Sequence, residues 1–146
     1  MLSMLRAALA FLGAQFHMPV ATYGATKILD AVGNATTTGG GLPTADVWVK
    51  LHIGDPTATC TGSAAAETTR KQVGFAAASS ASMVSNSDAA WTSVSTTETY
   101  SHISIWDNSS GGNALWYGQL SSNKSVTAGD NFTIPSGSLT LNIATT

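Results

Sequence analysis

One alternating stretch decides the fold: Val47-Trp48-Val49-Lys50-Leu51-His52-Ile53. Large apolar residues occupy every second position, and side chains on an extended strand point alternately to opposite faces. The stretch therefore predicts a strand that buries one face in a core and turns the other face away from it. The residues expected in the core are Val47, Val49, Leu51 and Ile53, and those expected on the other face are Trp48, Lys50 and His52.

The same period of two returns farther along the chain. Gly, Asn, Asp, Ser and Pro gather between the alternating runs, as they do in the turns that connect strands. This pattern predicts an all-β body: an antiparallel, jelly-roll-like β-sandwich of about eight strands over residues 42–146. Strands are expected near residues 47–53, 71–77, 81–85, 89–94, 99–106, 114–120, 124–127, 132–134 and 139–143.

Residues 1–41 predict a short helical arm and a Gly-rich linker. Residues 23–34 have apolar side chains near helical spacing, and Gly33-Asn34 is a plausible helix end. The apolar stretch 1–16 resembles a signal peptide and is too short for a membrane span, which needs about 20 apolar residues. We expect the stretch to be retained and to pack against a partner or against its own domain. The residues predicted for that interface are Leu5, Leu9, Phe11, Leu12, Phe16, Tyr23, Ile28, Leu29 and Val32.

Charge is sparse, and this excludes some classes of partner. Charged residues make up 10% of the chain and the net charge is −2, whereas soluble domains average about 25% charged residues. No basic patch is present, so nucleic-acid binding is not expected. Low charge suits a protein packed against its neighbours, although a Ser/Thr-rich extracellular domain would look similar. The single cysteine, Cys60, is interpreted as a small loop residue, with a reactive thiol as the alternative.

Candidate catalytic groups are few. His52 lies near Asp55 and His102 near Asp107, so each pair could orient an imidazole for acid–base chemistry. Serines are so common here that a Ser-His-Asp set can be drawn by chance, and no nucleophile elbow is present. The histidines are more simply exposed or sheet-bonded residues. No metal-ligand spacing or phosphate-binding loop is found, and the Asp-Asn pairs at 107 and 130 suit Asx turns. We therefore expect no enzyme, metal or cofactor.

The aromatic residues allow two interpretations. They could form a platform on which sugar rings stack, or they could fill the core and a subunit interface, where large aromatic side chains bury the most area. The second interpretation is favoured, with Trp106 and Trp116 packing across their shared hairpin. The residues concerned are Trp48, Trp91, Tyr100, Trp106, Trp116 and Tyr117.

Several segments, taken in order, resemble a group of tailed-phage virion proteins. They cover about residues 23–143 and leave the apolar arm outside. The matching segments are Leu51-His52-Ile53-Gly54-Asp55-Pro56, Glu67-Thr68-Thr69-Arg70 with Val73 and Phe75, Trp91-Thr92, Glu98-Thr99-Tyr100-Ser101-His102, Ile105-Trp106-Asp107 with Gly111-Gly112-Asn113, Val126-Thr127-Ala128-Gly129-Asp130, and residues 134–141.

The resemblance implies a structural role in the virion, as a minor tail or capsid-decoration protein on the particle surface, extracellular once released. It also implies a homo-oligomer, with a trimer as the expected form, that contacts the major capsid or tail proteins. No catalytic residue is carried over. Two other functions stay open: a carbohydrate-binding module that contacts a host-surface glycan, and a self-assembling extracellular filament subunit.

Overall fold

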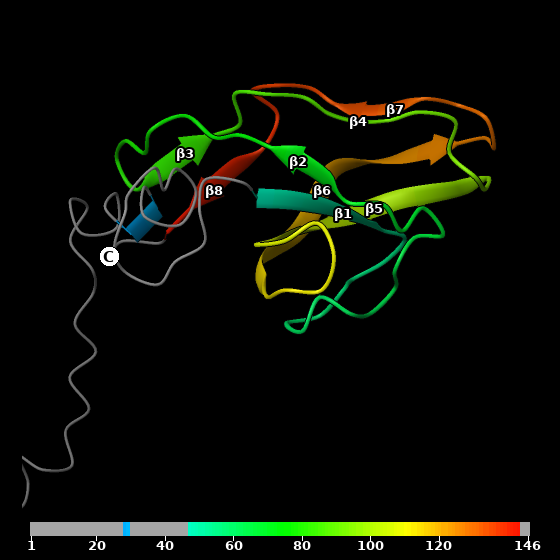
Figure 1. Ribbon diagram of the computed structural model, residues 1–146, viewed down its shortest axis with the longest axis horizontal. Coiled ribbons are helices and arrows are strands. Elements are labelled where there is room, and N and C mark those ends of the chain that lie inside the picture. Colours follow the sequence, from blue (N-terminus) through cyan, green and yellow to red (C-terminus); the bar gives the residue numbers. More distant parts are fainter. Residues whose placement is uncertain (1–27, 30–46, 144–146) are drawn as a thin grey trace, which may run out of the picture.

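The computed structural model describes residues 28–29 and 47–143 (Figure 1). Within these residues the protein is built of eight strands, and every strand pair is antiparallel. The expected all-β body is confirmed. Residues 28–29 have helical backbone; the rest of the predicted arm and the boundary at residues 41–42 lie outside the described part. The strands are β1 (Val47–His52), β2 (Lys71–Val73), β3 (Ser82–Val84), β4 (Ala89–Trp91), β5 (Glu98–Trp106), β6 (Ala114–Val126), β7 (Phe132–Ile134) and β8 (Thr140–Asn142).

Four strands form the main sheet, in the order β2-β1-β5-β6. In its centre Val49 of β1 lies opposite Ile105 of β5, and Leu51 lies opposite Ile103. All four side chains are buried, so the alternation of β1 points its apolar row into the core as expected. Ile53 is the exception, with 49% of its surface exposed. The strand ends at His52 and the chain bends there, so the alternation no longer governs where Ile53 points.

The remaining strands form a long ribbon that covers one face of the main sheet (Figure 1). β4 pairs with β7 and β3 pairs with β8. Backbone hydrogen bonds of Ser85 to Leu139 and Gly137 join the two pairs at the bend between them. The second layer is thus two short sheets in line, and the single jelly-roll-like sandwich stays a prediction.

The core lies between the sheet and the ribbon. Phe132 of β7 is partly buried and packs on this core against Trp91 and Tyr100, with ring centroids 5.7 and 5.0 Å away. Leu29 is fully buried in the same cluster. A segment far ahead of the first strand therefore contributes to the core of the body. The other buried members are Val47, Val49, Leu51, Ala65, Val73, Phe75, Met83, Ala89, Val94, Ile103, Ile105, Val126, Ile134, Leu139 and Leu141.

The predicted break between residues 120 and 124 is wrong, because β6 runs unbroken from Ala114 to Val126. Its pairing with β5 changes register instead. Tyr100 lies opposite Lys124, whereas His102 lies opposite Gln119, so the intervening residues of β6 bulge out of the ladder. Such an irregularity bends an edge strand without ending it.

Candidate functional site

His52 lies fully buried on the face of the main sheet away from the ribbon, so of the two positions expected for it, exposed or sheet-bonded, it takes the second. Its Nδ1 atom lies 2.9 Å from the carbonyl oxygen of Gly62, and Nε2 lies 2.7 Å from Oγ of Ser104. A carbonyl can only accept, so Nδ1 carries the proton and Nε2 accepts from the serine hydroxyl. Oγ of Ser104 in turn accepts from Nε1 of Trp106 at 2.7 Å. Burial lowers the pKa of His52 and favours this neutral ring.

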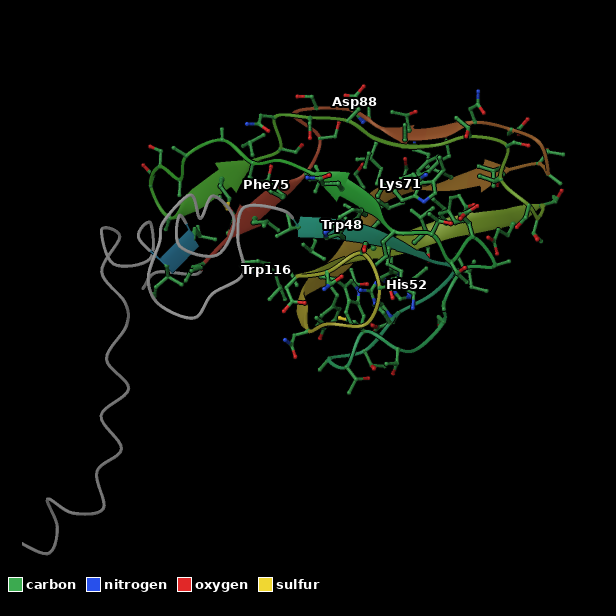
Figure 2. All side chains as sticks on the ribbon, in the orientation of Figure 1. Trp48, His52, Lys71, Phe75, Asp88 and Trp116 are labelled. Atoms are coloured by element: carbon green, nitrogen blue, oxygen red, sulfur yellow. The ribbon has the colours of Figure 1, made fainter. Side chains whose placement is uncertain are left out.

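The loop after β1 forms the cover over His52 (Figure 2). It returns along the end of the strand, where Ile53 N–H donates to Ser63 and Ala65 N–H donates to Leu51. Cys60 of this loop is buried, and burial raises the pKa of its thiol. A raised pKa reduces the thiolate fraction that makes cysteine reactive. The structure therefore favours a packed loop residue over a reactive thiol.

Neither predicted His–Asp pair is brought together. Asp55 Oδ1 accepts from the backbone N–H of Thr57, and His52 bonds Gly62 and Ser104 instead. The carboxylate of Asp107 accepts from the backbone N–H and the side-chain amide of Asn113. These bonds lower the pKa of Asp107 and tie the two ends of the hairpin together. The Asx turn predicted for the Asp107-Asn108 pair is made by Asn108, whose Oδ1 accepts from the backbone N–H of Ser110, whereas Asp107 closes the wider hairpin loop.

Arg70 fastens the same hairpin to the sheet. Its guanidinium lies 3.8 Å from the centroid of the Trp106 ring. Its Nη1 atom donates to the carbonyl oxygens of Asn108 and Gly111 at 2.7 and 2.6 Å. The planar guanidinium stacks on the Trp106 ring and donates hydrogen bonds to the turn at the same time. These contacts fix the position of the 107–113 turn.

The aromatic residues divide between core and surface. Trp91 and Tyr100 are buried in the core cluster, which supports core packing for these two, whereas Trp106 is buried on the other face of the sheet, under Arg70. Trp116 lies opposite Ile105, not Trp106, because the ladder shifts by a residue at that point. The predicted packing of Trp106 on Trp116 across the hairpin is therefore not the observed pairing. Tyr117 is 49% exposed.

The described residues form a groove of about 710 Å³ between the outer edges of the two layers. We call it the β6 groove. β6 forms one wall, and the outer edge of the ribbon, β7 and β8, forms the other. Its floor is aliphatic and its rim carries hydroxyl and amide groups. The floor includes Ile103, Ile105, Ile134, Leu139 and Leu141, and the rim includes Gln119, Ser121, Ser122, Thr133 and Asn142.

Sequence reasoning missed this groove. Its walls come from β6, β7 and β8, and no pattern within one strand tells which other strand faces it. Of the predicted interface residues, the structure describes Ile28, which is 46% exposed, and Leu29, which is buried in the core. The others, Leu5, Leu9, Phe11, Leu12, Phe16, Tyr23 and Val32, lie outside the described residues.

Two comparisons with known proteins bear on this arrangement. Residues 19–142 match the model of a family described as the podophage GP4 fiber I protein gp80. The match spans all eight strands. No curated protein matches the chain. Among the described residues, no helix has the length and apolar character to cross a membrane.

Proposed function

We propose that this chain, which belongs to the podophage GP4 fiber I protein gp80 family, is a homo-oligomeric fibre subunit on the surface of a tailed-phage particle. Membership of the family makes it a structural component of a phage virion. The match over residues 19–142 is the observation that carries the proposal. A fibre position on the tail is preferred to capsid decoration because the family is described by its fibre.

The body has properties that suit repeated assembly. Its surface is rich in Ser, Thr and Asn with few charges, so neighbouring copies repel one another little. Its turns are cross-linked by side chains: Asp107 binds Asn113, and Asp130 accepts from the backbone N–H of Thr127. Repeated modest contacts between such bodies can add up to a stable attachment.

Location and copy number on purified particles test the proposal. Quantitative mass spectrometry of virions, with the major capsid protein as the internal standard, gives the number of copies. Gold-labelled antibody against the chain gives the position. We expect a small number of copies, confined to the tail end of the particle. Copies in the hundreds over the head would mean decoration, and absence from the particle would overturn a virion role.

The oligomer is tested on the purified chain by light scattering after size-exclusion chromatography. We propose a closed homo-oligomer, and the resemblance to virion proteins favours a trimer. Species that keep growing with concentration would instead support a filament subunit.

The N-terminal arm is proposed to dock the body on the tail or capsid proteins. Because Leu29 is buried in the core, a deletion that extends past it would also disturb folding. Deletion of residues 1–16 separates the two effects. We expect a folded oligomer that no longer enters particles, and normal incorporation of the shortened chain would remove the arm from the interface.

A carbohydrate-binding function has weaker support. Stacking platforms need exposed ring faces, yet Trp91 and Tyr100 are buried in the core and Trp106 is covered by Arg70. Tyr117 remains as an exposed ring. Titration of tryptophan fluorescence with host polysaccharide tests this function, and a saturable shift would favour it.

A further inference from the structure

The two long sides of the body differ. On one side β2 of the main sheet contacts β4 of the ribbon, so the layers meet. On the other side the β6 groove separates β6 from β7 and β8. The ribbon is two segments wide and the main sheet is four strands wide, so the ribbon covers less than the whole sheet. The groove marks the place where the second layer has room for another strand.

The walls of the groove are strand edges. Among the described strands, β6 pairs only with β5, β7 only with β4, and β8 only with β3. Their outer edges therefore present backbone N–H and C=O groups along the groove. An extended polypeptide satisfies such groups by adding a strand, and alternate side chains of that strand would reach the floor. The aliphatic floor, with Ile105, Ile134 and Leu141, matches apolar side chains.

The charge of the groove narrows the choice of occupant. Lys124 is the single charged residue among its lining residues, so the occupant must be a nearly neutral segment rich in small polar and apolar residues. This chain has that composition, with 10% charged residues. The lining also includes the rings of Trp116, Tyr117 and Phe132 beside hydroxyl and amide groups, so a sugar is the competing occupant that the test must separate.

From these features we propose that the β6 groove is the interface between copies of this chain, where an extended segment of a second copy lies along β6 and the β7–β8 edge. The inference rests on the proposed homo-oligomeric fibre and locates its subunit contact. The bulge between Gln119 and Lys124 bends the edge. A bent edge disfavours open-ended strand pairing and restricts addition to a partner with a matching shape.

Gly118 offers a clean test. It lines the groove, and a Cβ atom added there meets no atom within 4 Å in the monomer. Gly118→Lys therefore begins its side chain in open space and adds a cation to the groove. Ser122→Lys places the same charge at an exposed position of the same wall. Gln72→Lys is the matched control, because Gln72 is exposed on β2 at the opposite edge of the same sheet.

The measurements are sedimentation velocity over a range of concentrations, circular dichroism for folding, and hydrogen exchange of peptides that cover β6. We expect the wild type to be oligomeric and its β6 amides to become more protected as concentration rises. Both groove variants should stay folded and should weaken association at least about tenfold. Gln72→Lys should associate like the wild type.

The outcomes separate this inference from the function on which it rests. A wild-type oligomer that tolerates both groove variants overturns the groove as interface and leaves the homo-oligomer standing. A wild type that is monomeric at every concentration overturns both. In that case a tryptophan fluorescence shift with host polysaccharide would assign the groove to a sugar. Loss of thermal stability in a monomeric Gly118→Lys would instead assign it to a segment of the same chain.

Discussion

Ser104 Oγ lies 2.7 Å from Nε2 of His52, which connects β5 to β1 across the face of the sheet that the ribbon leaves uncovered. Both residues are fully buried. The bond belongs to a chain of three: Trp106 donates to Ser104, Ser104 donates to His52, and His52 donates to Gly62. This chain fastens the 53–66 loop to the sheet and makes a buried imidazole part of the fold.

The buried imidazole should make stability depend on pH. The pKa of His52 in the folded chain is below its ordinary value of 6.5, mainly because burial disfavours the charged ring, with smaller effects of Lys50 and His102. The unfolded chain therefore binds the proton first as pH falls. We expect the free energy of unfolding to be highest above about pH 7 and to decrease as pH falls through about 6.5 towards 5. Urea unfolding at several pH values measures it.

His52→Gln is the control for that prediction. Its amide keeps a polar group near Ser104 but cannot titrate, so the variant should be less stable at pH 7 by about 1–3 kcal/mol. Its stability should also vary less between pH 7 and about pH 5 than that of the wild type. If the free energy of unfolding of the variant falls with pH as it does in the wild type, another group causes the loss of stability at low pH.

Leu51 and Ile53 form a matched pair. They lie two positions apart in the same alternating run, but Leu51 is fully buried and Ile53 is 49% exposed. Leu51→Ala should cost about 2–5 kcal/mol of unfolding free energy, because it leaves a cavity in the core. Ile53→Ala should cost well under half of that. Equal losses would mean that Ile53 enters the core after all.

Arg70→Lys tests the stack on Trp106. Lysine keeps the charge but loses the planar group that lies over the ring and donates to Asn108 and Gly111. We expect a loss of about 1–2 kcal/mol in stability and faster hydrogen exchange in the 107–113 turn. Lys124→Arg is the control, because it replaces one cation by the other at an exposed position of β6, where no change in stability is expected. An Arg70→Lys variant as stable as the wild type would show that the positive charge alone, without the planar group, stabilises the turn.

Ser85→Ala tests the contact that connects the β4–β7 pair to the β3–β8 pair. The hydroxyl oxygen of Ser85 accepts from the backbone N–H groups of Gly137 and Leu139 at 3.1 and 3.2 Å. Leu139 is buried, so its N–H loses a partner that water cannot easily replace. We expect a loss of about 1–3 kcal/mol, against little change for Ser95→Ala at an exposed site. Thermal unfolding measures both.

The order of strands and turns could be read from the sequence. Alternation placed β1 and β5 within a residue or two of their observed bounds, and it assigned Val47, Val49 and Leu51 to the core. The turn positions of Asp107 and Asp130 also followed from local sequence, although their carboxylates accept from Asn113 and Thr127 and not from the N–H two residues on, as an Asx turn requires. The sequence prediction fails at two places where alternation no longer controls the structure. At Ile53 a bend ends the strand, and near residue 120 a bulge replaces the expected break.

Local alternation fixes which residues share a face, since that depends only on the geometry of one strand. It cannot say what covers the face. Whether His52 meets water or Ser104, and whether β6 meets another strand or an open groove, is decided by segments tens of residues away. The burial and the lowered pKa of His52 arise when β1 pairs with β5 and the 53–66 loop folds over that face. The groove arises when the ribbon packs on the opposite face of the sheet.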